Sequence, residues 1–356
     1  MSLKEVRLGD ICLVKRGTTI TQKQAIEGDI PVVAGGLKPT YYHNQPNRIG
    51  TTITVSGSGA NAGFVNLWRQ PIFASDCSTV EVKNSELDIQ YIYYFLLSKQ
   101  EYIYKKLRSG AAQPHVYGKD IADLLINIPT FSSQQKIVAK LDAIFAEIDK
   151  ATVVIQANAT NADALFHSFL SNIEAPLSAL GEYVTIKTGK LDSNASVENG
   201  IYPFFTCSKE IFFINDYAFD CEAVLLAGNN ASGDFNVKHY KGKFNAYQRT
   251  YVITIHATDK LTYRYLYYQL INALKVFKNM SVGANTKFLK IGMIKELKFP
   301  LPPMDEQIKI LNTLEILERN TSLIKNNYQT RLNLTQTLKK SILHQAFSGE
   351  LIKEYE

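Results

Sequence analysis

The longest regular stretch of the chain reads IVAKLDAIFAEIDKATVVIQANATNADALFHSF, residues 137–169. Its apolar positions step by four and three residues throughout, which predicts an amphipathic helix with a heptad repeat. A spacing of 3.5 residues per turn requires a partner helix, because supercoiling around a partner keeps such a seam buried. The predicted seam consists of Ile137, Leu141, Ile144, Ile148, Ala151, Ile155, Asn158, Ala162, Leu165 and Phe169.

Two polar features of this helix carry expectations of their own. Ser132 or Ser133, just before Gln135, is expected to cap its first turn. Asn158 lies within the apolar seam, where a lone polar residue often fixes the register of a helix pair. A simple exposed polar position explains Asn158 nearly as well, so both interpretations stay open.

A second long helix is predicted from about residue 305 to 347. Its apolar seam loosens in the middle and consists of Ile310, Leu314, Leu317, Ile324 and Leu338, with Thr321, Tyr328 and Ile342 in the same register. At about 1.5 Å per residue, each helix would extend roughly 55–60 Å. We expect the two helices to form an antiparallel rod with one globular unit at each end. The alternative is two independent helices, each packed on its own domain.

The chain repeats itself at an offset of about 172 residues. The stretch Ser56–Gly63 is answered by Ala227–Gly233, and Tyr91–Tyr94 is answered by Tyr265–Tyr268. About a dozen such matches occur in the same order, with offsets from 171 to 177. A period this long indicates two copies of a whole module, because solenoid repeats run about 20–50 residues.

Each copy begins with a globular half of mainly β character. Short β-branched or aromatic runs bounded by Gly, Asn and Pro predict the strands, and the recurring tyrosines predict a helix near 88–107 and another near 262–279. The predicted fold class is therefore α+β, with two similar mainly-β domains joined by two long helices that form an antiparallel coiled coil. The predicted segments are 1–131, 132–173, 174–303 and 304–356.

Composition excludes several classes of protein. Of the 356 residues 46% are hydrophobic and 20% are charged, ordinary values for a chain that buries real cores. No apolar run approaches about 18 residues, so we expect no membrane span. The start of the chain has no signal-peptide pattern, and the four cysteines form no CxxC pair. A reducing cytoplasm fits best.

The positive charge belongs to the globular halves. The chain has a net charge of +6, of which residues 1–131 carry +3 and residues 174–303 carry +4, whereas the two helical segments carry −1 and 0. Lys and Arg neutralise phosphates, and Asn, Gln, Arg and Lys match the edges of bases in the major groove. If a polyanion binds this chain, the globular halves are therefore expected to hold it, and the helices are not.

Basic and polar residues near Gly- and Asn-rich loops are the candidate DNA-binding residues. For any single lysine a solvated surface position is the better interpretation, but the set and its duplication favour two DNA-reading surfaces. The candidates are Gly36, Lys38, Ser58, Asn61, Arg108, Gln113 and His115 in the first half, and Lys209, Asn229, Asn230, Lys238, Lys241, Arg249, Asn285 and Lys287 in the second.

Catalytic signatures are missing from the sequence. It contains no P-loop, no HxxxH or HExxH spacing, no GxSxG elbow and no Asn-Pro-Pro or Asp-Pro-Pro motif before an aromatic residue. No metal site or cofactor is therefore expected, and the chain is predicted to bind rather than to catalyse.

Three segments resemble one known family over essentially the whole chain. They are Gly110–Pro114 ahead of Ile126–Pro129 and Gln134–Val138, then Phe299–Gln307, and the C-terminal stretch Leu338–Leu351. They are similar to the DNA specificity subunit of type I restriction–modification systems. The resemblance implies two target-recognition domains that each read one part of a split, asymmetric site in double-stranded DNA, with the helices setting the gap. It also implies docking of two methyltransferase subunits, with motor-nuclease restriction subunits joining that complex and supplying its ATP chemistry.

Two departures from the family pattern carry expectations. The first copy has Pro129-Thr130-Phe131 where the second has Leu301-Pro302-Pro303, so its helix is expected to begin differently. The chain also begins directly at the first recognition domain, so domain surfaces or partners are expected to cover the C-terminal end of the helix pair.

Different loops in the two halves predict half-sites of different sequence, since Gly35–Lys38 has no likeness to Cys207–Glu210. Three alternatives remain: a recognition subunit of a related type II system, a scaffold that binds only proteins, and an enzyme in its own right.

Overall fold

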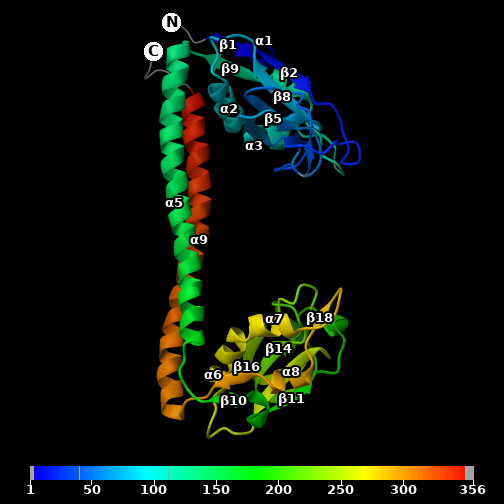
Figure 1. Ribbon diagram of the computed structural model, residues 1–356, viewed down its shortest axis with the longest axis vertical. Helices are drawn as coiled ribbons and strands as arrows, with labels where there is room; N and C mark the ends of the chain where they lie inside the picture. The colour runs from blue at the N-terminus through cyan, green and yellow to red at the C-terminus, as the bar shows by residue number, and fades with distance from the viewer. Residues whose placement is uncertain (1–3, 40, 111, 349–356) are drawn as a thin grey trace. The chain divides into compact units, whose positions relative to one another are not determined.

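The computed structural model describes residues 4–39, 41–110 and 112–348, and its chain divides into two compact units (Figure 1). Unit 1 contains the chain up to Val154 and the segment from Gln329 onward, and unit 2 is Ile155–Tyr328. Each unit therefore holds one globular half and part of each long helix. The segment limits at 131, 173 and 303 stay a prediction.

Unit 1 is built from three sheets and a group of helices. Antiparallel strands in the order β2-β8-β5-β6 form the main sheet, β4-β3-β7 form a second sheet, and β1 pairs with β9. Its strands are β1 (Lys4–Arg7), β2 (Cys12–Arg16), β3 (Ile30–Val33), β4 (Tyr42–His43), β5 (Thr52–Ser56), β6 (Val65–Trp68), β7 (Phe73–Ala74), β8 (Cys77–Val82) and β9 (Leu125–Ile128). Its helices are α1 (Leu8–Ile11), α2 (Ile89–Ser98), α3 (Gln100–Tyr102), a π-helical turn at Ile103–Leu107, α4 (Gly118–Ala122) and the first part of α5 (Phe131–Ser171).

Unit 2 repeats this order with a larger sheet. Its six strands run β11-β17-β14-β16-β12-β13, and two-stranded pairs form between β10 and β19 and between β15 and β18. The strands are β10 (Leu177–Ala179), β11 (Val184–Thr188), β12 (Tyr202–Phe205), β13 (Phe212–Ile214), β14 (Phe219–Ala227), β15 (Asn229–Asn230), β16 (Val237–Ala246), β17 (Thr250–Ile255), β18 (Lys287–Phe288) and β19 (Lys298–Pro300). The helices are 3-10 turns at Leu180–Glu182 and Ser193–Ala195, then α6 (Tyr263–Asn272), α7 (Leu274–Met280), α8 (Ile291–Lys295) and the first part of α9 (Met304–Phe347). The expected α+β architecture is confirmed.

A proline accounts for the main difference between the two sheets. In unit 2 the ten-residue strand β16 pairs with β14 on one side and with β12 on the other, which joins all six strands. In unit 1 two separate strands make the corresponding pairings: β6 pairs with β5, and β7 pairs with β3. Pro71 lies between β6 and β7. Proline has no N–H to donate to a strand ladder, so the strand is interrupted there.

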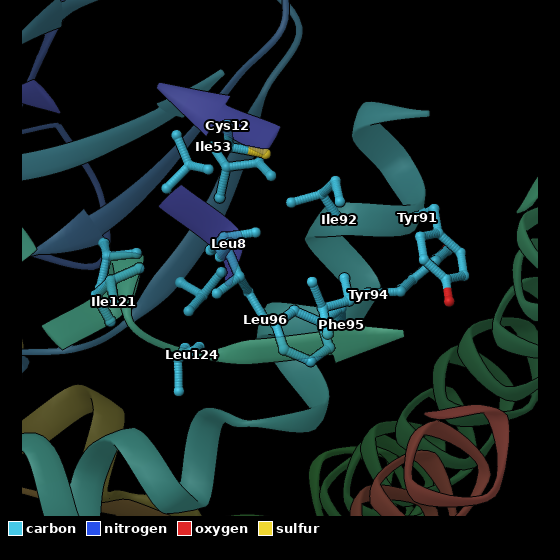
Figure 2. Close-up of a cluster of buried hydrophobic side chains, with 14 of the residues drawn as sticks. Leu8, Cys12, Ile53, Tyr91, Ile92, Tyr94, Phe95, Leu96, Ile121 and Leu124 are labelled. Carbon is cyan, nitrogen blue, oxygen red and sulfur yellow. The ribbon is translucent and has the colours of Figure 1, made fainter. Parts of the chain in front are cut away.

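The core of unit 1 is continuous with both long helices. Figure 2 shows side chains of the sheet, such as Ile53, facing Ile92 and Phe95 of α2, with Tyr91 extending on the opposite side of α2 toward the paired helices. Leu141 of α5 and Ala346 of α9 belong to the same buried cluster and are both 0% exposed. The end of α9 is therefore covered by the domain, as the sequence led us to expect.

Unit 2 attaches its globular part to the helices through a second apolar cluster. Phe166 and Leu170 of α5 meet Leu314 of α9 and Tyr268 of α6, and Leu170, Leu314 and Tyr268 are fully buried. The sheet and α6 enclose a separate core that contains Val224, among others. The globular part of unit 2 is thus connected to the helices through packed side chains.

The long helices pair in an antiparallel manner within each unit. In unit 1, Lys339 of α9 bonds the carboxylate of Asp149 of α5 at 2.5 Å. In unit 2, Lys325 reaches Asp163 at 2.7 Å, and the Thr321 hydroxyl donates to the Ala162 carbonyl at 3.4 Å. The predicted pairing is confirmed, and the alternative of two separate helices is wrong.

The predicted seam of α5 is correct near its start and holds only at alternate positions further along, where Ala162 and Phe169 are half-buried. Ile137 and Leu141 are fully buried and Ile148 is 8% exposed, with Ile144 half-buried. Ile155 in unit 2 is also half-buried. The later predicted seam residues Ala151, Asn158 and Leu165 are exposed, Leu165 by 59%. An ideal helix has 3.6 residues per turn, so its buried side drifts by about 20° per heptad from a strict 3.5 spacing.

At the three exposed positions the next residue along is the less exposed one: Thr152 and Ala159 are half-buried and Phe166 is 8% exposed. Asn158 points away from the pair, so of its two interpretations the exposed position is correct. On α9, Ile310, Leu314 and Leu317 face inward as predicted, whereas Ile324 and Leu338 are 37% and 49% exposed.

The first turn of α5 is capped one turn earlier than expected. The helix begins at Phe131, and the Thr130 hydroxyl oxygen accepts from the Ser133 backbone N–H at 3.3 Å and lies 2.9 Å from the Ser133 hydroxyl. Thr130 therefore serves as the cap in place of Ser132 or Ser133. The replacement of a second proline by Thr130 is what makes this cap available in the first copy.

A buried glutamine locks each globular part to the helix that follows it. Gln134 is 0% exposed; its amide donates to the carbonyls of Pro129 at 3.0 Å and Glu86 at 3.2 Å, and its oxygen accepts from the Asp88 N–H at 2.9 Å. Asp88 in turn caps α2. One side chain thus satisfies three backbone groups in two segments of unit 1, the loop before α2 and the loop before α5.

Gln307 makes the same contacts in unit 2. It is also 0% exposed, its amide donates to Pro302 at 2.9 Å and Lys260 at 2.7 Å, and its oxygen accepts from the Thr262 N–H at 3.2 Å. Thr262 caps α6 as Asp88 caps α2. Both glutamines occur in segments that carry the family resemblance. The structure explains their presence there, because each joins a globular part to the helix that follows it.

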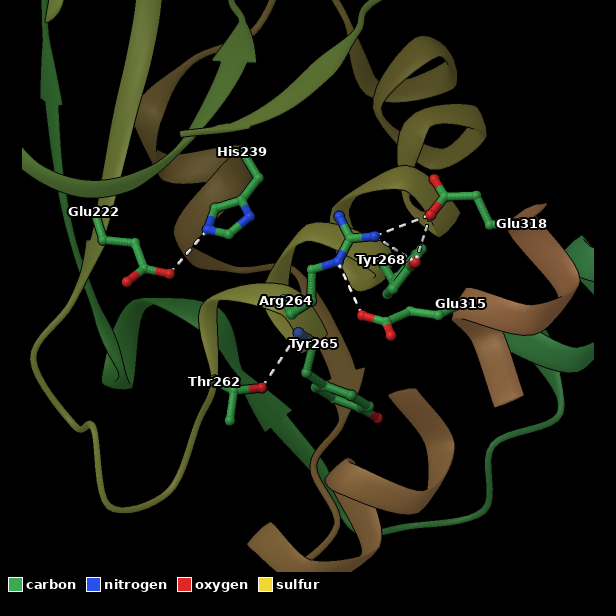
Figure 3. Close-up of polar contacts among 8 residues, drawn as sticks. All are labelled: Glu222, His239, Thr262, Arg264, Tyr265, Tyr268, Glu315 and Glu318. Atoms are coloured by element: carbon green, nitrogen blue, oxygen red, sulfur yellow. Dashed lines mark hydrogen bonds and ion pairs between the residues drawn. The ribbon is translucent and has the colours of Figure 1, made fainter. Parts of the chain in front are cut away.

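Charged contacts strengthen the junction in unit 2. Figure 3 shows Arg264 of α6 extended toward two carboxylates of α9, with Glu318 at 2.9 Å and Glu315 at 3.6 Å. The Tyr268 hydroxyl accepts from Arg264 at 2.8 Å and donates to Glu318 at 2.6 Å. In unit 1 the corresponding Tyr94 hydroxyl donates to Asp142 of α5. In both units, therefore, a tyrosine of the globular part bonds a carboxylate of a long helix, α5 in unit 1 and α9 in unit 2.

Among the described residues, no helix is long and apolar enough to cross a membrane. In the same part of the chain, no group of three or more His, Cys, Asp or Glu side chains could hold a metal ion.

The reactivity of the buried thiols tests the packing of unit 1. Cys12 and Cys77 are 1% and 2% exposed, and burial raises the pKa of each thiol to about 12. Only about one part in 10⁴ of such a thiol is ionised at pH 8. We expect iodoacetamide at pH 8 to modify the half-buried Cys207 first and to leave Cys12 and Cys77 unmodified, as read by mass spectrometry of peptides. In urea all four should react alike. Rapid native labelling of Cys12 would show that the unit 1 core is wrong.

Candidate nucleic-acid interface

Three loops of unit 1 meet at the end of β5, and we call their described residues loop cluster 1: residues 56–63, 75–77, and 108–110 with 112–118. The Gly57 N–H donates to the Asp76 carbonyl at 3.0 Å, and the Gly57 carbonyl accepts from the Val116 N–H at 3.0 Å. The Gly59 N–H donates to the Pro114 carbonyl at 3.0 Å. These backbone bonds fix the backbones of the three loops to one another.

Loop cluster 1 surrounds a small polar cavity. The cavity has a volume of about 310 Å³ and its lining includes Arg16, Ser58, Asp76, His115 and Lys119. Ser58 donates its hydroxyl hydrogen to the Asp76 carboxylate. The rings of His115 and Tyr117 stack, with centroids 6.4 Å apart. Donors, acceptors and a flat aromatic surface are therefore available together, as base recognition requires.

The Ser58–Asp76 contact is not a nucleophile site. A nucleophilic serine is activated by a histidine that accepts its proton. Here Ser58 donates directly to a carboxylate, and His115 is joined to Ser58 through a backbone bridge. The hydrogen bond from the Ser58 hydroxyl instead orients the Asp76 carboxylate.

The predicted residues of the first half have different roles in loop cluster 1. Ser58 and His115 line the cavity, and Gln113 lies exposed on the same loop as His115. Gly36 and Lys38 are exposed on the loop after β3, and Asn61 is half-buried in the glycine-rich loop.

Arg108 holds the loop together and is less available to a ligand than expected. Its Nε donates to the Ala62 carbonyl at 2.7 Å and its second amino group to the Ala60 carbonyl at 3.2 Å, while the guanidinium lies 4.1 Å from the centre of the Tyr104 ring. These contacts attach the Arg108 side chain to the backbone of the glycine-rich loop. Its primary role in the structure is therefore to position Ser58 and its neighbours.

Unit 2 contains an equivalent loop cluster 2, formed by residues 227–233, 247–250 and 281–289. The Gly228 N–H donates to the Arg249 carbonyl at 2.8 Å, and the Gly228 carbonyl accepts from the Leu289 N–H at 2.9 Å. Asn229 pairs with Phe288, and Asn230 pairs with Lys287, across the short ladder β15–β18. The predicted residues Asn229, Asn230, Lys287 and Arg249 are thus brought together.

Asn230 and its neighbours form a tight polar turn. The Asn230 side-chain oxygen accepts from the backbone N–H groups of Ser232 at 2.9 Å and Asp234 at 3.1 Å. Lys278 bonds Asp234 at 2.6 Å, which lowers the pKa of that carboxyl. Asn285 is exposed on the neighbouring loop. Lys278 and Lys287 lie on the same side of this turn, because a Cβ added at Gly233 would contact the side-chain carbons of both lysines.

Lys238 supports a loop in the same way as Arg108. Its ammonium donates to the Ser208 carbonyl and to the Asn236 side-chain oxygen, both at 2.5 Å, and burial lowers its pKa. The exposed Lys209 follows on the loop that Lys238 holds. Of the predicted basic residues near loop cluster 2, Lys209 and Arg249 are exposed and Lys287 is half-buried.

Lys241 lies away from loop cluster 2. It is on β16 opposite Glu222 of β14, whose carboxylate it approaches at 3.3 Å, and Lys238 pairs three positions further along the ladder. His239 shares the same carboxylate at 2.9 Å (Figure 3). The structure thus separates Lys241 from the other candidates.

Sequence reasoning missed Asp76, Arg16, Tyr117 and Lys119 in unit 1, and Lys278 in unit 2. Asp76 could have been found, because it precedes Cys77 at the position where the repeat places Arg249 before Thr250. Tyr117 and Lys119 could also have been found, because they follow His115 closely in the sequence. Arg16 on β2 and Lys278 on α7 are on elements that lie next to the loops only after folding.

The family model for the type I restriction modification DNA specificity domain matches this chain twice, over residues 2–157 and 174–334. The chain belongs to this family. The two matches coincide with the two copies of the module, so the internal repeat is a repeat of the family's own domain.

Known proteins agree with the family assignment. The chain is 38% identical over 176 residues to the type I restriction enzyme EcoDI specificity subunit of Escherichia coli, an alignment that spans 49% of this chain and 38% of that protein. It is 22% identical over 334 residues to the type I restriction enzyme MjaVIII specificity subunit of Methanocaldococcus jannaschii, spanning 82% of this chain and 77% of that protein.

A solved structure from a study of complex assembly and conformational transition in the type I R-M system has a similar fold. It matches with a TM-score of 0.73 at 18% identity, and covers 98% of this chain and 100% of the other. At this level of identity the likeness supports the fold.

Proposed function

We propose that this chain is the non-catalytic DNA-recognition subunit of a type I restriction–modification complex. The observation that carries the proposal is the duplicated loop cluster: each specificity domain presents backbone-fixed polar loops, and each is locked to the long helices by a buried glutamine. In this proposal each loop cluster reads one part of a bipartite, asymmetric site in double-stranded DNA. The paired helices set the number of base pairs between the parts, much as dimer geometry fixes half-site spacing in other DNA-binding proteins.

The proposal also includes protein partners, namely two methyltransferase subunits and, through them, the restriction subunits. Exposed apolar side chains along the helices support a docking role, because large apolar residues gathered on an exposed helix face often mark interaction sites. On α5 these are Val153, Val154 and Leu165, and on α9 Ile316, Leu323 and Leu334, each more than half exposed. Methyl donor and ATP belong to those partners, and the complex would act in the cytoplasm.

Salt dependence tests whether the chain binds DNA. We expect a fluorescein-labelled duplex, titrated with the chain and its methyltransferase subunits, to show affinity that falls steeply with salt, because each neutralised phosphate releases about 0.9 counterion. Lys209→Ala and Lys38→Ala should each weaken binding several-fold and reduce the log–log salt slope by about 1.

Lys150→Ala is the matched control, since Lys150 is an exposed lysine on α5 and is not on a loop of either globular half. It should leave the slope unchanged. Affinity that is absent or independent of salt would contradict the proposal and favour a scaffold that binds only proteins.

A further inference from the structure

The backbone bonds of the two loop clusters define which residues are equivalent. Gly57 donates to the Asp76 carbonyl as Gly228 donates to the Arg249 carbonyl. The next residue in each case also matches, because Gly17 donates to the Cys77 carbonyl at 2.8 Å and Gly189 donates to the Thr250 carbonyl at 3.4 Å. Asp76 and Arg249 therefore occupy the same place in the two domains.

Two neighbouring positions are equivalent by the same criterion. Ser58 bridges to His115 in unit 1, and Asn229 pairs with Phe288 in unit 2. The two domains thus share one backbone arrangement with different side chains at three positions: Ser58, Asp76 and His115 in one, and Asn229, Arg249 and Phe288 in the other. The largest difference is at the central position, where an acceptor-only carboxylate replaces a donor-only guanidinium.

We propose that Asp76 and Arg249 are paired specificity-determining residues that read bases of opposite hydrogen-bonding character. This inference rests on the proposed function. Asp76 accepts a hydrogen bond from an exocyclic amine, which in the major groove belongs to cytosine N4 or adenine N6. Arg249 donates to the O6 and N7 acceptors of guanine. The two half-sites therefore differ at the position that this pair reads.

The surroundings of Asp76 suit a reading role. Its carboxylate lines the polar cavity, where the Ser58 hydroxyl donates to one of its oxygens and so fixes its orientation. Gly35 approaches closely on one side, since an added Cβ there would meet the Ser58 carbonyl at 2.6 Å. A preorganised carboxylate loses little entropy on binding, which favours its use in recognition.

The surroundings of Arg249 leave its side chain free while its backbone is fixed. Its carbonyl accepts from both the Gly228 N–H and the Cys207 thiol at 3.3 Å, whereas the residue is exposed. Gly228 permits the approach, because a Cβ there would lie 2.3 Å from the Arg249 carbonyl. The side chain at this position can therefore change without disturbing the loops, as a specificity position requires.

Selection from a duplex library with randomised sequence tests the inference. The full chain with its methyltransferase subunits is used to enrich duplexes, which are then sequenced. Wild type should enrich a bipartite site with cytosine or adenine at one position of one half and guanine at one position of the other. Arg249→Gln should lower the preference for that guanine by roughly tenfold or more, and Asp76→Asn should alter the preference in the other half alone.

Two exposed residues outside the loop clusters provide matched controls, Arg319→Gln on α9 and Asp10→Asn on α1. Both controls should enrich the wild-type site. Because Arg249 is exposed, Arg249→Gln is expected to fold even if Asp76→Asn does not, so it tests the pair by itself.

The outcomes separate the inference from the function on which it rests. If Arg249→Gln enriches the same bipartite site with the same preference at every position, the inference is overturned and the proposed function stands. If wild type enriches no sequence at all, the proposed function fails and the inference fails with it. A change confined to the half-site of the altered domain supports both.

Discussion

A chain that ends at Ser341 is expected to lose the folded structure of unit 1 while unit 2 stays folded. The truncation removes Leu343 and Ala346, which are 6% and 0% exposed within the unit 1 core, and Phe347, whose ring lies 5.1 Å from that of Tyr91 and 5.8 Å from that of Phe95. Removing a buried leucine or phenylalanine side chain costs about 2–5 kcal/mol each. The combined loss, about 5 kcal/mol or more, is comparable with the whole stability of many domains.

Hydrogen exchange followed by mass spectrometry can check this result unit by unit. Amides of β5 and β8 should lose protection, whereas those of β14 and β17, which belong to the cores of unit 2, should keep it. A chain that ends at Ser348 is the control, because it retains every described residue of the unit 1 core. Equal protection of β5 in both chains would contradict the prediction and would mean that α9 contributes little to unit 1.

The internal repeat was the most informative feature of the sequence, and its success has a physical basis. Glycines recur where the backbone permits nothing else: Gly110 and Gly283 have φ of +89° and +115°, and an added Cβ would lie 2.6 Å and 2.0 Å from the carbonyls of Gln113 and Thr286. Such positions keep the two copies in register even though their loops differ. The repeat therefore predicted the shared architecture and where each loop cluster forms.

The choice between neighbouring apolar residues could not be predicted from spacing alone. Leu165 and Phe166 are both apolar, and a heptad spacing selects Leu165, whereas the helix buries Phe166 against Tyr268 at a centroid distance of 5.9 Å. The decision depends on which side of α5 faces α6, and that is a property of the folded unit. The heptad pattern was thus a correct predictor of the pairing and of the buried residues near the start of α5, and an incorrect predictor at Ala151, Asn158 and Leu165.

Charge alone could not separate binding residues from supporting ones either. Arg108 and Lys238 looked like the other basic candidates, yet each is bonded to carbonyl groups of its own unit. Such contacts join segments that are 30 or more residues apart, so local sequence carries no sign of them. Lys209 and Arg249 are basic like the other candidates, and their side chains are also exposed, so they can reach a ligand.

Gln134→Leu is expected to destabilise unit 1 far more than its neighbour Gln135→Leu. Leucine removes one acceptor and two donors from a fully buried site and leaves the Asp88 N–H and the carbonyls of Pro129 and Glu86 without this partner. Each such group costs about 1–3 kcal/mol, so we expect the free energy of unfolding to fall by about 3 kcal/mol or more. For a unit of this size that corresponds to roughly 6–12 °C in Tm.

Gln135 is exposed on the same turn of α5, so Gln135→Leu controls for helix propensity and added apolar surface. Calorimetry of both variants measures the difference. The same logic applies in unit 2, where Gln307→Leu is compared with Gln156→Leu, an exposed position on the part of α5 that belongs to unit 2. If Gln134→Leu and Gln135→Leu unfold at the same temperature, the glutamine does not hold the junction. If Gln307→Leu destabilises unit 2 as Gln134→Leu destabilises unit 1, the equal cost means that each domain is joined to its helix by the same three hydrogen bonds, and that the duplication preserved a joint as well as a fold.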